Sequence, residues 1–272
     1  MKVAIFSNTQ PATILVVEKL KQLLKEKNIT VVEAESDPEI VISVGGDGTM
    51  LSAFRHYLPR IERVRFIGVH TGHLGFYTDY REFELDELVD SLSESQCADV
   101  SYPILRVEAY KGDSLEPFLI DHALNESTVR RVVSTFTCNV LIKGDFFEKF
   151  RGDGLSISTP TGSTAYNKSL GGAVIHPTVK ALQVTEIASL NNSIFRTLGS
   201  PMVISPDEWV EVELLDPTDV DLSVDNLILH DTGVTRLKYQ IAKERIHFVK
   251  YRHMHFWDRV GNSFIYPKKK YD

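Results

Sequence analysis

The sequence predicts an α/β N-terminal domain with a mainly parallel sheet, followed by a β-rich, sandwich-like C-terminal domain. Over residues 1–100, short apolar runs alternate with amphipathic segments, which is the order that builds a parallel sheet covered by helices. Residues 101–250 carry short runs of β-branched and aromatic residues, which favour mostly antiparallel strands. Residues 251–272 include an aromatic stretch, and we expect them to pack back on the first domain.

The first domain is expected to alternate between strand and helix. Its longest helix is predicted where Val17, Leu20 and Leu24 recur at helical spacing, with Lys and Glu on the opposite face. The predicted order is strand 2–7, helix 13–27, strand 39–46, helix 49–58, strand 64–70 and helix 82–92. Ligands gather at the carboxyl ends of the strands in such sheets. The segments 45–49 and 70–77, which follow two of these strands, are therefore candidate site segments.

The second domain is expected to be built from short strands. They are predicted at residues 104–110, 136–144, 155–160, 209–215, 220–224 and 236–241. One segment, residues 178–190, places Val179, Leu182 and Ile187 near helical spacing. We therefore predict a helix there, inserted among the strands.

Composition excludes several functional classes. The chain has 272 residues, of which 43% are hydrophobic and 25% charged, and its net charge is −7, which argues against a surface that binds nucleic acid or an anionic membrane. No apolar run reaches the roughly 18 residues that span a bilayer, and the first ten residues are too short an apolar run for a secretory signal. Cys97 and Cys138 lack metal-ligand spacing and are expected to be reduced thiols. These features predict a cytoplasmic protein.

Three glycines surround one acid in the sequence GGDGT, residues 45–49, between a predicted strand and a predicted helix. The dinucleotide fingerprint GxGxxG and the phosphate loop ending in GK[ST] are both absent. Such glycines let backbone N–H groups approach phosphate oxygens, and the following helix adds its positive end. Asp47 would hold Mg²⁺ or take a proton from an attacking hydroxyl. The alternative is an ordinary Asp-Gly turn.

A second polar cluster comprises residues 124–128 and 150–172. Its hydroxyls, amides and Asp153 are groups that fix an adenine, a ribose or a carboxamide by hydrogen bonds. Tyr166 is placed to stack on a base, or simply to pack, and Arg151 to pair with a phosphate or with a surface carboxylate. The alternative for the whole cluster is a polar loop between strands.

Five histidines, which are His70, His73, His247, His253 and His255, are not expected to bind a metal. The last three lie among aromatic and basic neighbours, and no acid stands at ligand spacing. We predict no dedicated protein site for a metal ion.

The ordered set GGDGT, HTGHLGF, LNE, RGDG and TPTGSTAYNKSLGG resembles the NAD kinase family over nearly the whole chain. These enzymes phosphorylate NAD on the adenosine 2′-hydroxyl with ATP. Diacylglycerol and sphingosine kinases and ATP-dependent phosphofructokinases share a loop like GGDGT, but not this order of motifs. The resemblance implies NAD in the cleft between the two domains.

The resemblance also implies roles for individual residues. Asp47 matches the proposed general base, Phe76 an aromatic residue beside NAD, and Ala188 a contact supplied across a subunit interface. Asn226 stands where many relatives have Gly or His. The expected nucleotide-binding residues are Gly45, Gly46, Asp47, Gly48, Phe76, Asn125, Glu126, Arg151, Asp153, Thr161, Thr164, Ala165, Tyr166, Asn167, Lys168, Ser169, Ala188 and Asn226.

The implied partners are ATP, NAD and further copies of the chain, usually in a homotetramer. Mg²⁺ or another divalent cation is implied by triphosphate chemistry, and would be held mainly by the phosphates. Inorganic polyphosphate stays an alternative donor and NADH an alternative acceptor. Two rival functions are a lipid kinase, which would need a greasy or basic membrane-facing surface, and a dinucleotide sensor, which would not need Asp47.

Overall fold

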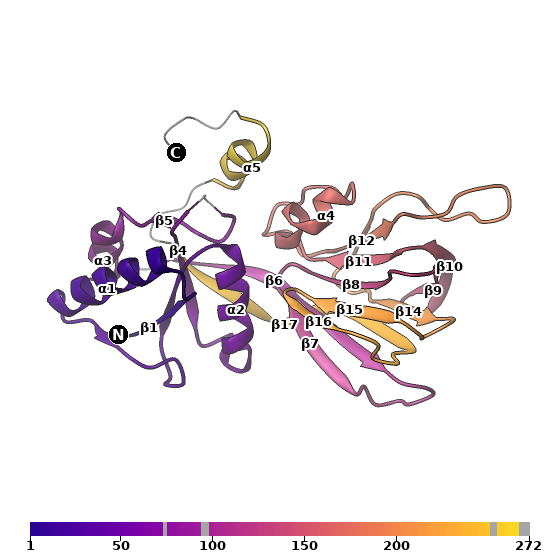
Figure 1. The fold of residues 1–272 in the computed structure, drawn as a ribbon, viewed down its shortest axis with the longest axis horizontal. Helices are drawn as coiled ribbons and strands as arrows, with labels where there is room; N and C mark the ends of the chain where they lie inside the picture. The colour runs from indigo at the N-terminus through magenta and orange to yellow at the C-terminus, as the bar shows by residue number, and fades with distance from the viewer. Residues whose placement is uncertain (73–74, 94–97, 251–254, 267–272) are drawn as a thin grey trace. The chain divides into compact units, whose positions relative to one another are not determined.

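The computed structural model describes residues 1–72, 75–93, 98–250 and 255–266 (Figure 1). The chain forms two compact units, the first made of Met1–Ser101 with Arg245–Asp272 and the second of Tyr102–Glu244. Strand β6 (Ala98–Tyr110) carries the chain out of the first unit, and strand β17 (Arg236–Lys250) brings it back. Within the described ranges, no helix has both the length and the apolar character needed to cross a membrane.

The first unit contains a parallel sheet. Its strand order is β17-β4-β3-β1-β2, β5 pairs with β4, and each of these pairings is parallel. The elements are β1 (Lys2–Ser7), α1 (Pro11–Glu26), β2 (Thr30–Val31), β3 (Ile40–Val44), α2 (Asp47–Tyr57), the 3-10 helix η1 (Leu58–Arg60), β4 (Arg65–His70), β5 (Tyr80–Arg81), α3 (Leu85–Ser93) and α5 (Phe256–Phe264). All five residues of β3 are buried, as expected for a parallel strand with both faces covered.

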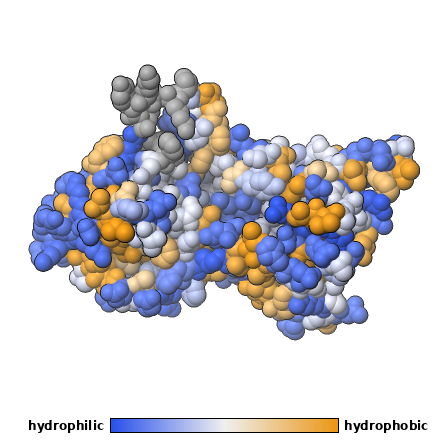
Figure 2. Space-filling view, viewed as in Figure 1, coloured by the Kyte–Doolittle hydropathy of each residue, from blue (hydrophilic) through white to orange (hydrophobic). Residues whose placement is uncertain are grey.

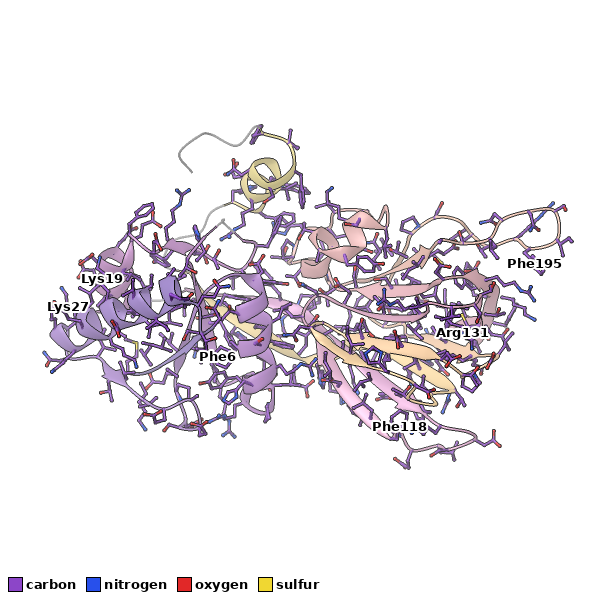
Figure 3. The ribbon with its side chains drawn as sticks, viewed as in Figure 1. Phe6, Lys19, Lys27, Phe118, Arg131 and Phe195 are labelled. Atoms are coloured by element: carbon purple, nitrogen blue, oxygen red, sulfur yellow. The ribbon has the colours of Figure 1, made fainter. Side chains whose placement is uncertain are left out.

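Helices cover both faces of this sheet. Helix α1 buries Val16, Leu20 and Leu24 in one core with β1, β3 and α3. Its exposed lysines, Lys19 and Lys27, which are labelled in Figure 3, pair with carboxylates of α3 at 3.5 and 2.7 Å, so α1 and α3 lie side by side. The ring of Phe6 on β1 contacts a ring of α2, and its neighbour Ile5 packs into the α1 core. Because successive strand residues point to opposite faces, α2 covers the face opposite α1.

The second unit is a sandwich of two antiparallel sheets. The strand order of one sheet is β7-β6-β17-β14-β9-β10, and that of the other is β13-β12-β11-β8-β15-β16. Side chains from both sheets form one core. The further elements are β7 (Leu119–Ala123), β8 (Glu126–Arg131), β9 (Phe136–Ile142), β10 (Asp145–Gly152), β11 (Gly154–Ser158), η2 (Thr161–Thr164), α4 (Tyr166–Ser169), β12 (Leu182–Ile187), β13 (Met202–Ile204), β14 (Val210–Leu214), β15 (Val220–Val224) and β16 (Leu227–Leu229). The predicted fold class is confirmed.

The helix predicted over residues 178–190 is wrong. The segment forms strand β12, which pairs with β11 on one side and β13 on the other. Leu182 and Val184 enter the sandwich core, while Thr185 on the opposite face is also buried. Val179, which the helix would have buried, is 43% exposed. Burial on both faces removes the alternation that marks a strand, so the spacing of a few apolar residues resembled a helix.

Candidate functional site

The GGDGT loop joins β3 to α2 at the carboxyl edge of the parallel sheet. The N–H of Gly45 donates to the carbonyl of Val69 on β4 at 2.8 Å. Gly45 has a φ of +150°, and a Cβ there would lie 2.3 Å from the Thr49 hydroxyl oxygen, so only glycine fits. Gly46 caps α2, and its carbonyl accepts the N–H groups of Thr49 and Met50. Because a Cβ on Gly46 or Gly48 would meet only open space, this side of the loop has room for a ligand.

Asp47 opens helix α2, and its carboxylate is fixed by two backbone groups. Oδ2 accepts the N–H of Phe76 at 2.9 Å and Oδ1 accepts the N–H of Tyr77 at 3.0 Å. A Cβ on Gly75 would lie 2.1 Å from Oδ1, so glycine at this position leaves the space that the carboxylate occupies. A carboxylate oxygen can accept more than one hydrogen bond. The two N–H groups therefore orient Asp47, and its oxygens can still accept a further hydrogen bond.

Phe76 contributes both its backbone and its ring to this region. Its half-buried ring stacks on Phe264 with centroids 5.8 Å apart, and lies 6.4 Å from the ring of Phe256. Both partner rings belong to α5. The predicted motif at residues 70–76 includes His73 and Leu74, which lie outside the described residues.

In the second unit, the segment Leu124–Glu126 is held from two sides. Asp225 accepts the N–H of Leu124 at 2.7 Å, of Asn125 at 2.8 Å and of Glu126 at 3.2 Å. Asp225 has a φ of +51° in the two-residue turn between β15 and β16, a conformation that Asp tolerates better than most residues. Asn226, the exposed second residue of that turn, lies at the same end of the sheet as Glu126.

Threonine hydroxyls hold the same segment from the other side. Thr159 and Thr161 both donate to the carbonyl of Leu124, at 2.6 and 2.8 Å. The following 3-10 helix η2 approaches closely, because a Cβ on Gly162 would lie 2.0 Å from the carbonyl oxygen of Asn125. The backbone around Asn125 is therefore rigidly positioned.

Glu126 is the most electrostatically perturbed carboxyl of the predicted set. Burial, together with the neighbouring Asp225 carboxylate, raises the pKa of Glu126 to about 8. Its Oε2 atom is buried without a hydrogen-bond partner. The side chain therefore carries a proton at neutral pH and can donate a hydrogen bond.

A small pocket adjoins this carboxyl. It has a volume of about 200 Å³ and is lined by Glu126, Thr128, Arg130, Tyr166, Asp221, Ser223, Asp225 and Ile228. Tyr166, on helix α4, is 39% exposed. The pocket is open and polar, which suits a nucleoside or sugar better than an apolar ligand.

The remaining residues of the motif 159–172 differ in exposure. Thr161, Thr164 and Asn167 are buried, and the carboxamide oxygen of Asn167 accepts the hydroxyl of Thr185 at 2.6 Å. Asn167 thus ties α4 to strand β12. Ala165 and Lys168 are partly exposed and Ser169 is exposed.

Arg151, Asp153 and Ala188 form a separate cluster. They adjoin Gly154, which pairs with Ile187 and Arg130, whereas Ser158 at the other end of β11 pairs with Glu126. The length of β11 separates the two groups by about 14 Å. The Arg151 guanidinium lies 3.9 Å from the ring of Phe195, in the long loop between β12 and β13 (Figure 3).

The structure thus brings together Asn125, Glu126, Thr161, Tyr166 and Asn226, but not Arg151, Asp153 and Ala188 in the same chain. Sequence reasoning missed Gly75, Thr159 and Asp225 as supporting residues. Asp225 carried a local signal, because an Asp-Asn pair between two short apolar runs indicates a turn whose carboxylate can accept nearby N–H groups. Gly75 and Thr159 lie within the predicted segments 70–77 and 150–172, but no local pattern distinguished them from their neighbours.

Within the described ranges, no group of three or more His, Cys, Asp or Glu side chains could hold a metal ion. His70 is buried, and its Nδ1 atom lies 2.9 Å from the carbonyl oxygen of Gly72. Cys138 is a buried free thiol whose pKa burial raises. Cys97, His73 and His253 lie outside the described residues.

Two family models match the chain. The ATP-NAD kinase N-terminal domain model matches residues 3–97, and the ATP-NAD kinase C-terminal domain model matches residues 124–252. A protein named NAD kinase from Lacticaseibacillus paracasei is 53% identical over 268 residues, which cover 98% of this chain and 100% of that protein. Another, from Enterococcus faecalis, is 53% identical over 267 residues, covering 97% and 99% of the two chains.

Two solved structures share the fold. Yeast NADH kinase complexed with NADH superposes with a TM-score of 0.85 at 21% identity, over 100% of this chain and 90% of that one. An NAD kinase from Archaeoglobus fulgidus in complex with ATP gives a TM-score of 0.73 at 20% identity, over 92% and 94%.

Both halves of the chain match the same family, and the relatives at about half identity span its whole length. The resemblance inferred from the five motifs is therefore confirmed. The chain belongs to the NAD kinase family.

Proposed function

We propose that this chain transfers the γ-phosphate of ATP to the 2′-hydroxyl of the adenosine ribose of NAD, giving NADP, with Asp47 as the general base. The observation that carries the proposal is the Asp47 carboxylate, oriented by the N–H groups of Phe76 and Tyr77 at the carboxyl edge of the sheet. The family and the names of its close relatives supply the reaction.

In this mechanism the 2′-oxygen attacks the γ-phosphorus and its proton passes to an Asp47 oxygen. The bond from the γ-phosphorus to the bridging oxygen breaks, and ADP leaves. Open space beside Gly46 and Gly48 supports backbone approach to phosphate, and the N-terminus of α2 favours negative charge there. Mg²⁺ would arrive with ATP and be held mainly by the phosphates.

We assign the adenosine to the group formed by Asn125, Tyr166 and Asn226, beside the pocket at Glu126. Thr161, Thr164, Ala165, Lys168 and Ser169 belong to the same segment and would complete its surroundings. Asn167 is better described as a support, because its carboxamide already bonds Thr185. Glu126 is a poor candidate for the base, since a carboxyl with a pKa of about 8 is mostly protonated at neutral pH.

The length of β11, about 14 Å, separates this group from Arg151, Asp153 and Ala188. This distance is longer than an adenosine. We therefore assign them to the nucleotide site of a neighbouring subunit in a homo-oligomer, a tetramer as in the family. The loop between β12 and β13 exposes Leu190, Ile194 and Leu198, which favours burial against another copy (Figure 2). With soluble substrates, the enzyme would work in the cytoplasm.

The first prediction concerns the reaction and its base. Purified protein with ATP, Mg²⁺ and NAD should form NADP, followed with an NADP-specific dehydrogenase. Asp47→Asn should lower kcat roughly 10²-fold to 10⁴-fold, the usual contribution of a positioned base, and change nucleotide binding far less. Asp37→Asn, an exposed carboxylate in the same unit, is the matched control. Absence of NADP with the unmodified protein contradicts the function, and near-normal kcat in Asp47→Asn contradicts the base.

The second prediction concerns the adenosine pocket. Asn125→Ala should weaken NAD binding by about 1 to 3 kcal/mol, because a partly buried hydrogen-bond partner of the adenine is lost. Calorimetry measures the affinity, and Asn139→Ala, on a strand of the other sheet, is the control. Unchanged NAD affinity in a folded Asn125→Ala protein would place the adenosine elsewhere.

The third prediction concerns the shared site. Asn125→Ala and Asp153→Ala should each be weakly active at limiting NAD. If the two residues serve one site from different subunits, co-expressing the two variants regenerates sites with both native residues, about a quarter of the total for random pairing. The measurement compares the rate of NADP formation by the co-expressed mixture with the rate of each variant alone. No recovery in an assembled mixture shows that both residues act within one chain.

A further inference from the structure

Helix α5 carries an arginine that is almost completely buried. Arg259 is 5% exposed, and its guanidinium donates to the carbonyls of Gly75 at 2.9 Å and Thr78 at 2.5 Å, and to the carboxylate of Asp79. The rings of Phe256 and Phe264 from the same helix contact Phe76. Helix α5 therefore holds residues 75–79 through both charge and packing.

These bonds act on the peptide groups that hold Asp47. The carbonyl of Gly75 and the N–H of Phe76 belong to one planar peptide group and point in opposite directions. Arg259 binds the oxygen end of this group, and the Asp47 carboxylate accepts its N–H end. A cation on the carbonyl also polarises the peptide, which strengthens the N–H as a donor.

A second peptide group is held in the same way. The carbonyl of Thr78 accepts from Arg259, and the N–H of the next residue, Asp79, donates to the carbonyl of Gly68 on β4 at 3.0 Å. The segment is thus fastened to the sheet at one end and to Asp47 at the other. Arg259 binds the carbonyl side of both peptides.

We propose that Arg259 is a positioning residue for Asp47. It fixes the peptide group between residues 75 and 76, so that the Asp47 carboxylate points at the acceptor hydroxyl. The inference rests on the proposed function. Lysine would keep the charge but not the planar fork of donors that bridges two carbonyls and a carboxylate.

The test is a double-mutant cycle of Arg259→Lys and Asp47→Asn, with kcat and both KM values measured in the full-length protein. Arg259→Lys should lower kcat roughly 10-fold to 100-fold, as expected for a displaced reacting group, with KM for NAD and ATP changed less than about threefold. In the Asp47→Asn background the same change should have almost no effect on kcat. Arg63→Lys, an exposed arginine in the same unit, is the matched control.

The outcomes separate the two proposals. Near-normal kcat in Asp47→Asn alone overturns the general base, and with it any action of Arg259 through Asp47. A second outcome is a loss of kcat in Asp47→Asn, with Arg259→Lys lowering kcat equally in the unmodified protein and in the Asp47→Asn variant. This outcome supports Asp47 as the general base and overturns the positioning role of Arg259. Should Arg259→Lys not fold, Asp79→Asn replaces it, because this change leaves the guanidinium in place and weakens only its charged partner. The expected loss is then smaller, about 3-fold to 10-fold, and again confined to the protein with Asp47.

Discussion

The candidate site in the first unit depends on two hydrogen bonds from backbone N–H groups to the Asp47 carboxylate. Strands β3 and β4 are parallel neighbours, so the segments that follow them meet at one edge of the sheet. Glycine at position 45 allows the tight exit from β3, and glycine at position 75 leaves room for the carboxylate itself. The Asp47 carboxylate is thus held in one orientation by the loop glycines, the first turn of α2 and the helix α5. Such an orientation is what a general base requires before any substrate arrives.

In the second unit, too, hydrogen bonds between side chains and backbone groups hold a candidate site segment in place. Asp225 gathers three consecutive N–H groups of the segment Leu124–Glu126, while two threonine hydroxyls hold the carbonyl at its start. The contacts of Asp225 join residues about 100 positions apart, because β8 and β15 are paired. Burial, together with the neighbouring Asp225 carboxylate, raises the pKa of Glu126 and keeps it protonated. Glu126 thus becomes a hydrogen-bond donor, and Asp47 is the carboxylate proposed for proton transfer.

The sequence predicts the parts of this architecture that depend on local pattern. The longer strands and helices over residues 1–92, and the place of Asp47 between a strand and a helix, follow from periodicity and from the loop glycines, whereas the two-residue strands β2 and β5 and the 3-10 helix η1 were not predicted. It fails where tertiary pairing decides, as in β12, whose two buried faces hide its alternation. It also cannot predict that Arg259 meets the carbonyl of Gly75, 184 residues earlier, because no spacing encodes which helix returns to which loop. The five ordered motifs predict candidate site residues, but they do not distinguish these from the residues that support them, such as Gly75 and Thr159.

We propose that Asp47 takes the proton from the ribose 2′-hydroxyl. The most direct measurement is a crystal structure of the protein with NAD and a non-hydrolysable ATP analogue. We expect the adenosine 2′-oxygen to lie within hydrogen-bond distance of an Asp47 oxygen, about 2.6 to 3.2 Å, with the N–H groups of Phe76 and Tyr77 still bonded to the carboxylate. A 2′-oxygen that instead contacts another carboxylate, such as Glu126 or Asp153, with Asp47 out of reach, would contradict it.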